Sequence, residues 1–591
     1  MRGICGWVAA GAGGAGGIDP SRVSGVMRGA LAHRGHIGWL GAPSDAAPAA
    51  VADSSFNGPD DLLRAWSASR GDAAAFAAAL NGSFAAAVLD LGSRRLILAR
   101  DRLGEKPLYY MASSAGVAFA SEIKALRAAG FVFKDDVDAT ALDAFLAFTY
   151  IPAPWTFFSH VRKVPAGHTV HVDLDRLAAG AAEATEVTPY WRLPDRAGLE
   201  ANPAEMLERL SQALERRLPH DGDLSVFLSG GLDSSLVTML AARAGGSRRA
   251  LHTWSVSFSE PRLDESIHAR RVAGLARAHH HEIPMPEVDP ALVSQVLHHL
   301  DEPMADAATL PNWVLAREAA GTSAVALTGD GADALLAGDH WFRRLQALDA
   351  LEHWPRPLRS ALMAAAGLGG EERRRRASAR RALLELSGPA RYLAMREKWT
   401  ARERAALYTP DFARRVKQAA VADTYLKAPL DWEGGSVDAA IRMDARHGLP
   451  EGLLMKGDKM GMAHGVETRS PFVDPEFAAW CARLGLRRLL KGNTGKWLLK
   501  QAALELLPRD LVHRRKRGLQ VPIGRWLKGP LRDLTEAAFH AGRLEEQGIF
   551  DPAAMALIKR RFEAGPAAPA LDGKIWQLVA MQTWWAGGLK D

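Results

Sequence analysis

The sequence predicts two domains of different fold class. An N-terminal α+β domain with antiparallel sheets precedes an α/β domain with a doubly wound parallel sheet and a helical C-terminal part. The first prediction rests on short apolar strands separated by tight turns in residues 1–190. The second rests on buried strands that alternate with helices from about residue 200. We therefore assign residues 1–190 to the first domain and 200–591 to the second.

Composition limits the class of protein. Of the 591 residues, 48% are hydrophobic and 24% are charged, which is typical of globular domains. The net charge of +7 is spread along the chain and does not indicate a nucleic-acid partner. No run reaches the ~18 apolar residues of a membrane span, and the glycine-rich opening is interpreted as mature protein, not as a signal peptide. Two cysteines, Cys5 and Cys481, cannot form a disulfide framework, so we expect a cytoplasmic protein.

The first domain is predicted from its hairpins. Residues 84–89 (FAAAVL) and 95–99 (RLILA) flank the turn 90–93 (DLGS), and residues 117–120 (VAFA) form a further short strand. Many strands with few long helices favour antiparallel sheets.

The second domain begins with a regular alternation of elements. In order, the sequence predicts a helix at 203–218, a strand at 224–228, a helix at 236–244, and strands at 252–258 and 323–328. Ligands of parallel sheets bind beyond the carboxyl ends of the strands. The glycine turns at 229–235 and 329–331 both fall at that edge. The chain is predicted to be mostly helical from about residue 340, with an Ala/Arg-rich insertion at 355–385. The basic run at 373–376 in this insertion is interpreted as a solvated face, with a dock for an acidic partner as the alternative.

The turn at 229–235 (SGGLDSS) carries the most chemical information. Gly230 and Gly231 let backbone N–H groups approach an anion, three serines supply hydroxyl donors, and the following helix points its positive end at the same place. This pattern predicts a phosphate site, in which Asp233 is best explained as a ligand of Mg²⁺. The alternative is a plain glycine turn with serine caps. The six-residue core would arise by chance in about one in 10³ chains of this length.

This loop resembles the pyrophosphate loop of the N-type ATP pyrophosphatases, and the rest of the chain is similar to the asparagine synthetase superfamily. That family joins a class II glutamine amidotransferase domain (Ntn-hydrolase-like) to a synthetase domain (adenine nucleotide α-hydrolase-like). The stretches that carry the resemblance, in the family's order, are ARDRLGEKPLYY, FASEIKAL, SFSEPRLDES with the later His281, DEPMAD, GDGAD, ETRSPFVD, LPRDLVHRRKRGLQVP and the closing IWQLVAMQTWW.

The resemblance implies ATP and Mg²⁺ as cofactors and assigns roles to particular residues. It implies that a carboxylate attacks the α-phosphorus and that an amine then displaces AMP. Asp233 and Asp333 would bind the metal, Lys516 would contact the phosphates and the oxyanion, and Asp330 would act as general base or acceptor-site acid. Ala334 departs from the family, which has an acid after the matched Asp333. The residues implied to bind the nucleotide are Leu228, Ser229, Gly230, Gly231, Asp233, Ser234, Ser235, Val256, Thr328 and Gly329.

The front domain departs from the family's glutaminase. The family's nucleophile is a cysteine at position 2, where this chain has Arg2. An alternative register starts the domain at Cys5 and requires removal of four residues; otherwise Cys5 is expected to be a buried strand residue. The acidic continuation after His33-Arg34-Gly35 and the arginine-bearing segment before Asn81 are absent. We expect a retained scaffold without glutaminase activity.

Three hypotheses follow. The leading one is an ATP-dependent ligase that closes an amide bond within its own substrate, with a lasso peptide macrolactam synthetase as the favoured case. Its partners would be a peptide carboxylate substrate and a precursor-peptide protease. The second hypothesis is an asparagine synthetase-type enzyme that takes free ammonia, or glutamine through a processed Cys5. The third is a non-catalytic scaffold of a biosynthetic complex.

Overall fold

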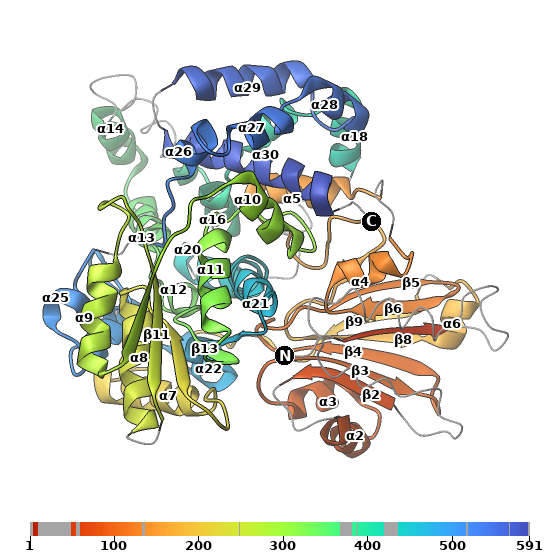
Figure 1. The fold of residues 1–591 in the computed structure, drawn as a ribbon, viewed down its shortest axis with the longest axis horizontal. Coiled ribbons are helices and arrows are strands. Elements are labelled where there is room, and N and C mark those ends of the chain that lie inside the picture. Colours follow the sequence, from red (N-terminus) through yellow and green to blue (C-terminus); the bar gives the residue numbers. More distant parts are fainter. Residues whose placement is uncertain are drawn as a thin grey trace.

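Two antiparallel sheets form the front of the protein (Figure 1). The computed structural model describes residues 4–9, 49–54, 59–132, 136–181, 183–246, 249–366, 381–386, 388–418, 435–515, 518–565 and 568–588. One sheet has the order β1 (Cys5–Ala9), β6 (Gly116–Ala120), β5 (Tyr109–Ser113), β7 (Arg162–Lys163). The other has the order β2 (Ala49–Ser54), β3 (Phe84–Asp90), β4 (Arg95–Arg100), β8 (His168–Asp173), β9 (Thr185–Pro189). The predicted hairpin is confirmed, because β3 and β4 pair antiparallel across the turn at 90–93.

Short helices complete the front domain. They are α2 (Pro59–Ala68), α3 (Ala73–Ala79), α4 (Ile123–Ala128), α5 (Ala139–Phe148) and α6 (Leu174–Ala178). Leu62, Trp66 and Phe76 of α2 and α3 are buried against Phe84 and Ile97 of β3 and β4. These apolar contacts cover one face of the five-stranded sheet, as the hydrophobic effect requires.

The second domain contains the predicted parallel sheet. Its order is β12 (His279–Pro284), β11 (Leu251–Ser257), β10 (Leu224–Phe227), β13 (Val325–Leu327), β14 (Glu467–Arg469), and all neighbours are parallel. Helices α7 (Pro203–Glu215), α8 (Leu232–Gly245), α9 (Ser266–Ala276) and α11 (Thr309–Ala319) flank it. The fold class predicted for both domains is confirmed. The edge strands β12 and β14 were missed, because one is rich in histidine and the other is polar and three residues long.

Helices dominate the remainder, as predicted. They are α10 (Pro290–His298), α12 (Ala332–Leu335), α13 (His340–Glu352), α14 (Arg356–Ala366), α16 (Gly388–Arg396), α17 (Ala401–Ala405), α18 (Pro410–Gln418), α20 (Ser436–Met443), η1 (Asp444–Leu454), α21 (Met455–Met462), η2 (Pro471–Val473), α22 (Pro475–Arg483), α23 (Leu486–Leu489), α24 (Trp497–Ala503), α25 (Arg509–Val512), α26 (Ile523–Lys528), α27 (Arg532–Ala538), α28 (Ala541–Gln547), α29 (Pro552–Ala564) and α30 (Pro569–Gly588). The small hairpin β15 (Leu490–Lys491) and β16 (Thr494–Gly495) precedes α24.

One apolar core runs through both domains. The front-domain residues Phe145 and Phe157 pack with Trp576 and Trp584 of α30 in a single buried cluster. The ring centroids of Phe157 and Trp584 are 4.9 Å apart in an edge-to-face arrangement, which is favourable for aromatic pairs. Figure 1 shows α30 above the front sheets, next to α5 and α10. The front domain is therefore joined to the helical layer by packing as well as by the chain.

Some predictions differ from the structure or lie outside it. Helix α8 begins at Leu232, four residues before the predicted start, because the residues after Gly231 adopt the first helical turn. Arg2, His33-Arg34-Gly35, the basic run at 373–376 and Lys516 lie outside the described residues. In the part of the chain that is described, no helix has the length and apolar composition needed to cross a membrane.

Candidate active site

The glycine loop is folded tightly between β10 and α8. Gly230 has φ +74°, and a Cβ on it would lie 2.7 Å from the backbone nitrogen of Ala269, so only glycine fits. The hydroxyls of Ser229 and Ser234 lie 3.0 Å apart and share a hydrogen bond, and Gly231 N–H donates to Ser229 Oγ at 3.3 Å. The N-terminus of α8 opens onto this loop, as an anion site requires.

A second turn, after β13, meets the glycine loop. Strand β13 pairs with β10 through Val226 and Leu327, so the carboxyl ends of both strands lie together. A Cβ on Gly329 would lie 2.8 Å from Ser234 N and 2.9 Å from Asp233 Cβ, so the two turns are in contact. The chain then turns at Gly331, φ +91°, into the short helix α12 that carries Asp333.

Asp233 and Asp333 converge on the side chain of Lys496. Lys496 Nζ lies 2.6 Å from Asp233 Oδ2 and 2.5 Å from Asp333 Oδ1. Burial lowers the pKa of Lys496, but the two carboxylates outweigh it and hold this pKa above its usual value. The sequence analysis missed Lys496, because its only signal is a lysine between β16 and α24.

The donor set fits the cation that the sequence implies. Two carboxylates from the first turns of α8 and α12 point at one cationic atom, and Mg²⁺ at nucleotide sites is held by one or two carboxylates with phosphate oxygens as further ligands. Within the described residues no cluster of three or more His, Cys, Asp or Glu could hold a metal by itself. A Mg²⁺ ion held by Asp233 and Asp333 would therefore depend on the phosphates for its remaining ligands, and Lys496 occupies the position between the carboxylates.

The residues assigned to the nucleotide gather at one edge of the sheet. Leu228 directly follows β10 and Thr328 directly follows its neighbour β13. Val256 lies near the end of β11, which pairs with the other edge of β10. All three are buried. Ser235, in the first turn of α8, has a buried hydroxyl with no hydrogen-bond partner among the described residues, which marks a polar group available to a ligand.

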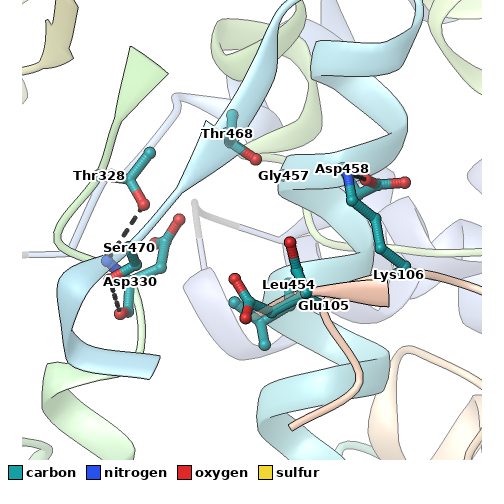
Figure 2. Close-up of a pocket in the computed structure, with 10 residues that line it drawn as sticks. Glu105, Lys106, Thr328, Asp330, Leu454, Gly457, Asp458, Thr468 and Ser470 are labelled. Atoms are coloured by element: carbon teal, nitrogen blue, oxygen red, sulfur yellow. Dashed lines mark hydrogen bonds and ion pairs between the residues drawn. The ribbon is translucent and has the colours of Figure 1, made fainter. Parts of the chain in front are cut away.

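Asp330 lies at the meeting point of both domains (Figure 2). Its backbone carbonyl accepts from Ser470 Oγ at 2.6 Å, and its backbone N–H donates to Thr328 Oγ1 at 3.4 Å. Burial raises the pKa of the Asp330 carboxyl, while Lys456 lowers it. A raised pKa suits a general base.

A small cavity separates Asp330 from the front domain. It has about 10 Å³, room for about one water molecule. Glu105 and Lys106 of the front domain line it opposite Asp330 (Figure 2). Lys106 Nζ lies 3.2 Å from Asp458 Oδ1 of α21, so an ion pair bounds the cavity on one side.

A much larger cavity opens beside Asp333. Its volume is about 870 Å³, and Asp333, Ala334 and Asp306 are among the residues that line it. Four aromatic side chains contribute to its walls: Phe148, Tyr150, Trp341 and Trp576. Ala334, which stands where the family has an acidic residue, therefore lines this cavity. Lys456 of α21 contacts Asp306 at 2.5 Å between Nζ and Oδ2.

The basic loop near Lys516 is described only at its flanks. Arg514 Nη2 donates to the carbonyl of Gly230 at 3.1 Å, and Arg514 Nη1 lies 2.7 Å from Glu265 Oε1. The segment just before Lys516 thus contacts the glycine loop. Arg514 belongs to the stretch LPRDLVHRRKRGLQVP that carries the family resemblance, but it was given no role of its own in the sequence analysis.

Cys5 is a buried strand residue, as the main interpretation of the front domain expected. It pairs with Ala120 of β6 and is 5% exposed. Its burial in the sheet disfavours the alternative in which Cys5 is a free N-terminal nucleophile.

Comparisons with known proteins agree with this geometry. Residues 205–586 match the family described as asparagine synthase, and residues 60–191 match the glutamine amidotransferase domain. The second match begins after Arg2 and Cys5. A putative glutamine-hydrolysing asparagine synthetase of Mycobacterium tuberculosis H37Rv is 28% identical over 86% of this chain and 76% of its own length. Asparagine synthetase 1 of Bacillus subtilis is 29% identical over 77% of this chain and 70% of its own length. Amidase chyE of Penicillium rubens is 25% identical over 80% of this chain and 75% of its own length.

The asparagine synthase match covers more than half of the chain and includes the glycine loop, Asp330 and Asp333. The matched region also includes the residues that converge at the carboxyl edge of the parallel sheet. This chain therefore belongs to the asparagine synthase family and is an ATP-dependent carbon–nitrogen ligase.

Proposed function

We propose that this ligase activates a carboxylate of a large substrate as its adenylate and joins it to an amine carried by the same substrate, as in a peptide macrolactam of the lasso type. The observation that carries the proposal is the cavity of about 870 Å³ beside Asp333. Cavities of roughly 300–1,000 Å³ bury drug-sized ligands. A single aspartate would leave most of this one empty.

The chain's residues would divide the chemistry as follows. The glycine loop and α8 bind the phosphates, and Asp233 and Asp333 hold Mg²⁺, which would neutralise charge on the phosphate oxygens. A carboxylate oxygen of the substrate forms a bond to the α-phosphorus, and pyrophosphate leaves. The amine nitrogen then forms a bond to the acyl carbon and AMP leaves, while Asp330 takes the proton that the amine gives up. Lys516 would stabilise the oxyanion.

The interface below Asp330 supports a nitrogen source on the substrate. Ammonia released in the front domain would have to cross the boundary that holds the cavity of about 10 Å³. The buried Lys106–Asp458 ion pair stands at that boundary. The large cavity instead reaches Asp333 and Ala334 of α12, so a substrate that fills it could carry its own amine to the phosphate site.

The second candidate is amidation of aspartate or another acid with ammonia. The names of the relatives favour it, since several are called asparagine synthetases. Both candidates use ATP, which is abundant in the cytosol, and we propose this compartment for the reaction. The macrolactam candidate also proposes a peptide substrate and a protease that releases its amine.

Pyrophosphate exchange separates the two. Purified protein is incubated with Mg²⁺, ATP and labelled pyrophosphate, with either a short peptide carrying a free N-terminal amine and an aspartate side chain, or L-aspartate with ammonium in excess. The proposal expects exchange, AMP and a product one water lighter only with the peptide. Asparagine formed with ammonium, or glutamine hydrolysed at an enzymatic rate, would contradict it.

A further inference from the structure

The large cavity is built by both domains. Phe148, Thr149 and Tyr150 line it from the end of α5 and the two residues that follow in the front domain. Next to them, η1 supplies a part of the wall whose lining residues are Asp444, Gly448, Leu449, Gly452 and Leu453. A front domain without glutamine chemistry would therefore still form part of the substrate site.

The wall η1 has an unusual backbone. It is an 11-residue π-helix with Pro450 inside, set between α20 and α21. π-Helical stretches are rare and tend to occur at functional sites. A sparsely populated backbone conformation costs free energy and persists only where surrounding contacts stabilise it. We therefore expect contacts with neighbouring elements to hold η1 in place.

The front domain supports η1 on the cavity side through Tyr150. A Cβ on Gly452 would lie 3.0 Å from Tyr150 Cδ1, and a Cβ on Gly448 would lie 3.6 Å from Tyr150 Oη. The lack of a side chain at Gly452 therefore lets the Tyr150 ring approach the backbone of η1 closely, while at Gly448 the Tyr150 hydroxyl is at ordinary contact distance. Pro450 meets the front domain as well, since a Cβ on Gly104 would lie 2.8 Å from Pro450 Cβ.

A buried charge cluster anchors η1 to the front domain. Glu451 Oε1 accepts from Arg100 Nη1 at 2.8 Å, and Glu451 Oε2 lies 3.2 Å from Lys163 Nζ. The side chains of Arg100 and Glu451 have no exposed surface, and that of Lys163 is 1% exposed. Glu302, which pairs with Lys163, makes the cluster two cations and two anions.

Arg100 also fixes the cluster within the front domain. Its guanidinium donates to the backbone carbonyls of Lys106 at 2.7 Å, Val164 at 3.0 Å and Gly104 at 3.0 Å. Lys163 Nζ donates to the carbonyl of Ile151, the residue after Tyr150, at 2.5 Å. The groups that hold Glu451 are thus tied to the segment that lines the cavity.

We propose that the front domain of this ligase serves as a substrate-specificity element. Tyr150 is a specificity-determining residue of the acceptor cavity, and Arg100, Lys163 and Glu451 are positioning residues that hold η1 against it. The inference rests on the proposed function in one respect, namely that this cavity receives the carboxylate substrate. Buried ion pairs contribute little to net stability but can fix the register of the elements they join.

The first test is Glu451→Gln, which keeps the side-chain shape and removes the charge. We expect amide hydrogens in peptides covering 444–454 to exchange with deuterium at least tenfold faster than in the parent protein, while peptides covering β10 and α8 are unchanged. The matched control is Asp175→Asn, which breaks the exposed Arg94–Asp175 pair of the same domain and should change neither. Unchanged exchange at 444–454 would overturn the inference, and this readout needs no substrate.

The double variant Lys163→Met/Glu451→Gln separates positioning from stability. It restores a neutral cluster, so the midpoint of thermal unfolding should return most of the way to the parent value. The contacts of Glu451 with Arg100 and Lys163 stay altered, so fast exchange at 444–454 should remain. Recovery of both properties would show a merely structural cluster and would contradict the positioning role.

Tyr150→Ala tests specificity with the charge cluster intact. With the peptide probe defined above, we expect its KM in pyrophosphate exchange to change at least tenfold and the KM for ATP to stay within about twofold. Tyr150→Phe should behave like the parent protein if ring packing is what matters. Equal changes in both KM values would refute the role of Tyr150. If the parent protein shows no pyrophosphate exchange with any carboxylate tested, the proposed function fails. The deuterium-exchange measurement on Glu451→Gln still decides the inference.

Discussion

At the scale of single residues, the ammonium group of Lys496 lies where the reaction is expected to need Mg²⁺. Lys496 bridges Asp233 and Asp333, the two acids expected to bind Mg²⁺. Without a partner these carboxylates would repel each other across the contact between two turns. Lys496 therefore offsets one of the two negative charges in the absence of nucleotide, and Mg²⁺ must displace it or share its position.

Replacing Lys496 should reveal the competition between its ammonium group and Mg²⁺ for Asp233 and Asp333. Lys496→Met leaves two carboxylates facing each other and should lower stability by about 3–5 kcal/mol, the range found when one partner of a buried pair is removed. Addition of Mg²⁺ should raise the midpoint of thermal unfolding more in the variant than in the parent, because binding stabilises the folded state. Lys491→Met is the control, since Lys491 is exposed over Trp497. Equal Mg²⁺ shifts in variant and parent would argue against the competition.

Asp330 should control the amide-forming step and leave adenylation intact. Burial raises the pKa of its carboxyl, and a general base acts in its ionised form. The rate of product formation should therefore fall as the pH drops through this raised pKa. Asp330→Asn should lower product formation by about 10²–10⁴-fold and remove that pH dependence, while pyrophosphate exchange stays within a few-fold of the parent. A parallel loss of exchange would assign Asp330 to nucleotide binding instead.

At the scale of elements, the glycine loop shows how backbone conformation builds the site. Gly230→Ala adds a Cβ in a left-handed conformation and 2.7 Å from Ala269 N. Gly71→Ala is a matched control, because Gly71 has φ +81° and open space around it. We expect G71A to cost about 1–2 kcal/mol, the strain alone, and G230A to cost more and to abolish the thermal stabilisation by Mg²⁺–ATP. Retained stabilisation by nucleotide in G230A would contradict the role of the loop.

The elements predictable from sequence were those with strong local signals. The 90–93 hairpin and the strands β10, β11 and β13 carry turn residues or apolar runs, and the structure contains all of them. Strand β12 was not predictable, because His279, His280 and His281 give no apolar pattern, and its pairing with β11 decides its conformation. The π-helix η1 was hidden for a similar reason. Its backbone is supported by Tyr150 and Glu451 contacts that join residues about 300 positions apart.

The residues of the candidate site also divide into those with a local sequence signal and those that only the tertiary structure brings in. Ser229, Asp233 and Asp333 lie in motifs that can be read locally, and strand pairing then brings them together. Lys496 joins the site from a hairpin more than 160 residues away, so only the tertiary structure could reveal it. The large cavity is likewise a product of both domains and has no local signature.

At the scale of the whole molecule, buried ion pairs join the two domains. Besides the cluster at Glu451, Arg217, two residues after α7, binds Glu105 of the front domain through Nη1, which lies 2.8 Å from Oε1 and 2.7 Å from Oε2. Both side chains are less than 10% exposed. Arg217 also donates to the carbonyl of Val473 at 2.9 Å. With the shared core around Trp584, these contacts predict that the domains unfold together.

Loss of Arg217 should therefore destabilise the entire protein in a pH-dependent way. Arg217→Met leaves Glu105 buried without its cation and should lower the free energy of unfolding by about 3–5 kcal/mol at pH 8, with both domains unfolding in one urea transition. Burial raises the pKa of Glu105 from 4.5 to about 7 even beside Arg217. Because the folded state then binds the proton more tightly than the unfolded state, this group's contribution to stability is present at low pH and is lost as the pH rises from about 4.5 to 7.

In Arg217→Met the pKa of Glu105 rises further, since the opposing cation is gone. Lowering the pH from 8 to 6 should therefore protonate Glu105 in the variant and narrow its stability difference from the parent. The double variant Glu105→Gln/Arg217→Met carries no charge at this position, so its deficit should be smaller at pH 8, and lowering the pH should not narrow that deficit as it does in Arg217→Met. Urea unfolding at both pH values, followed by tryptophan fluorescence and circular dichroism, measures all three proteins. A deficit of Arg217→Met that is constant with pH, or separate transitions in the parent protein, would contradict the coupling of the domains through this pair.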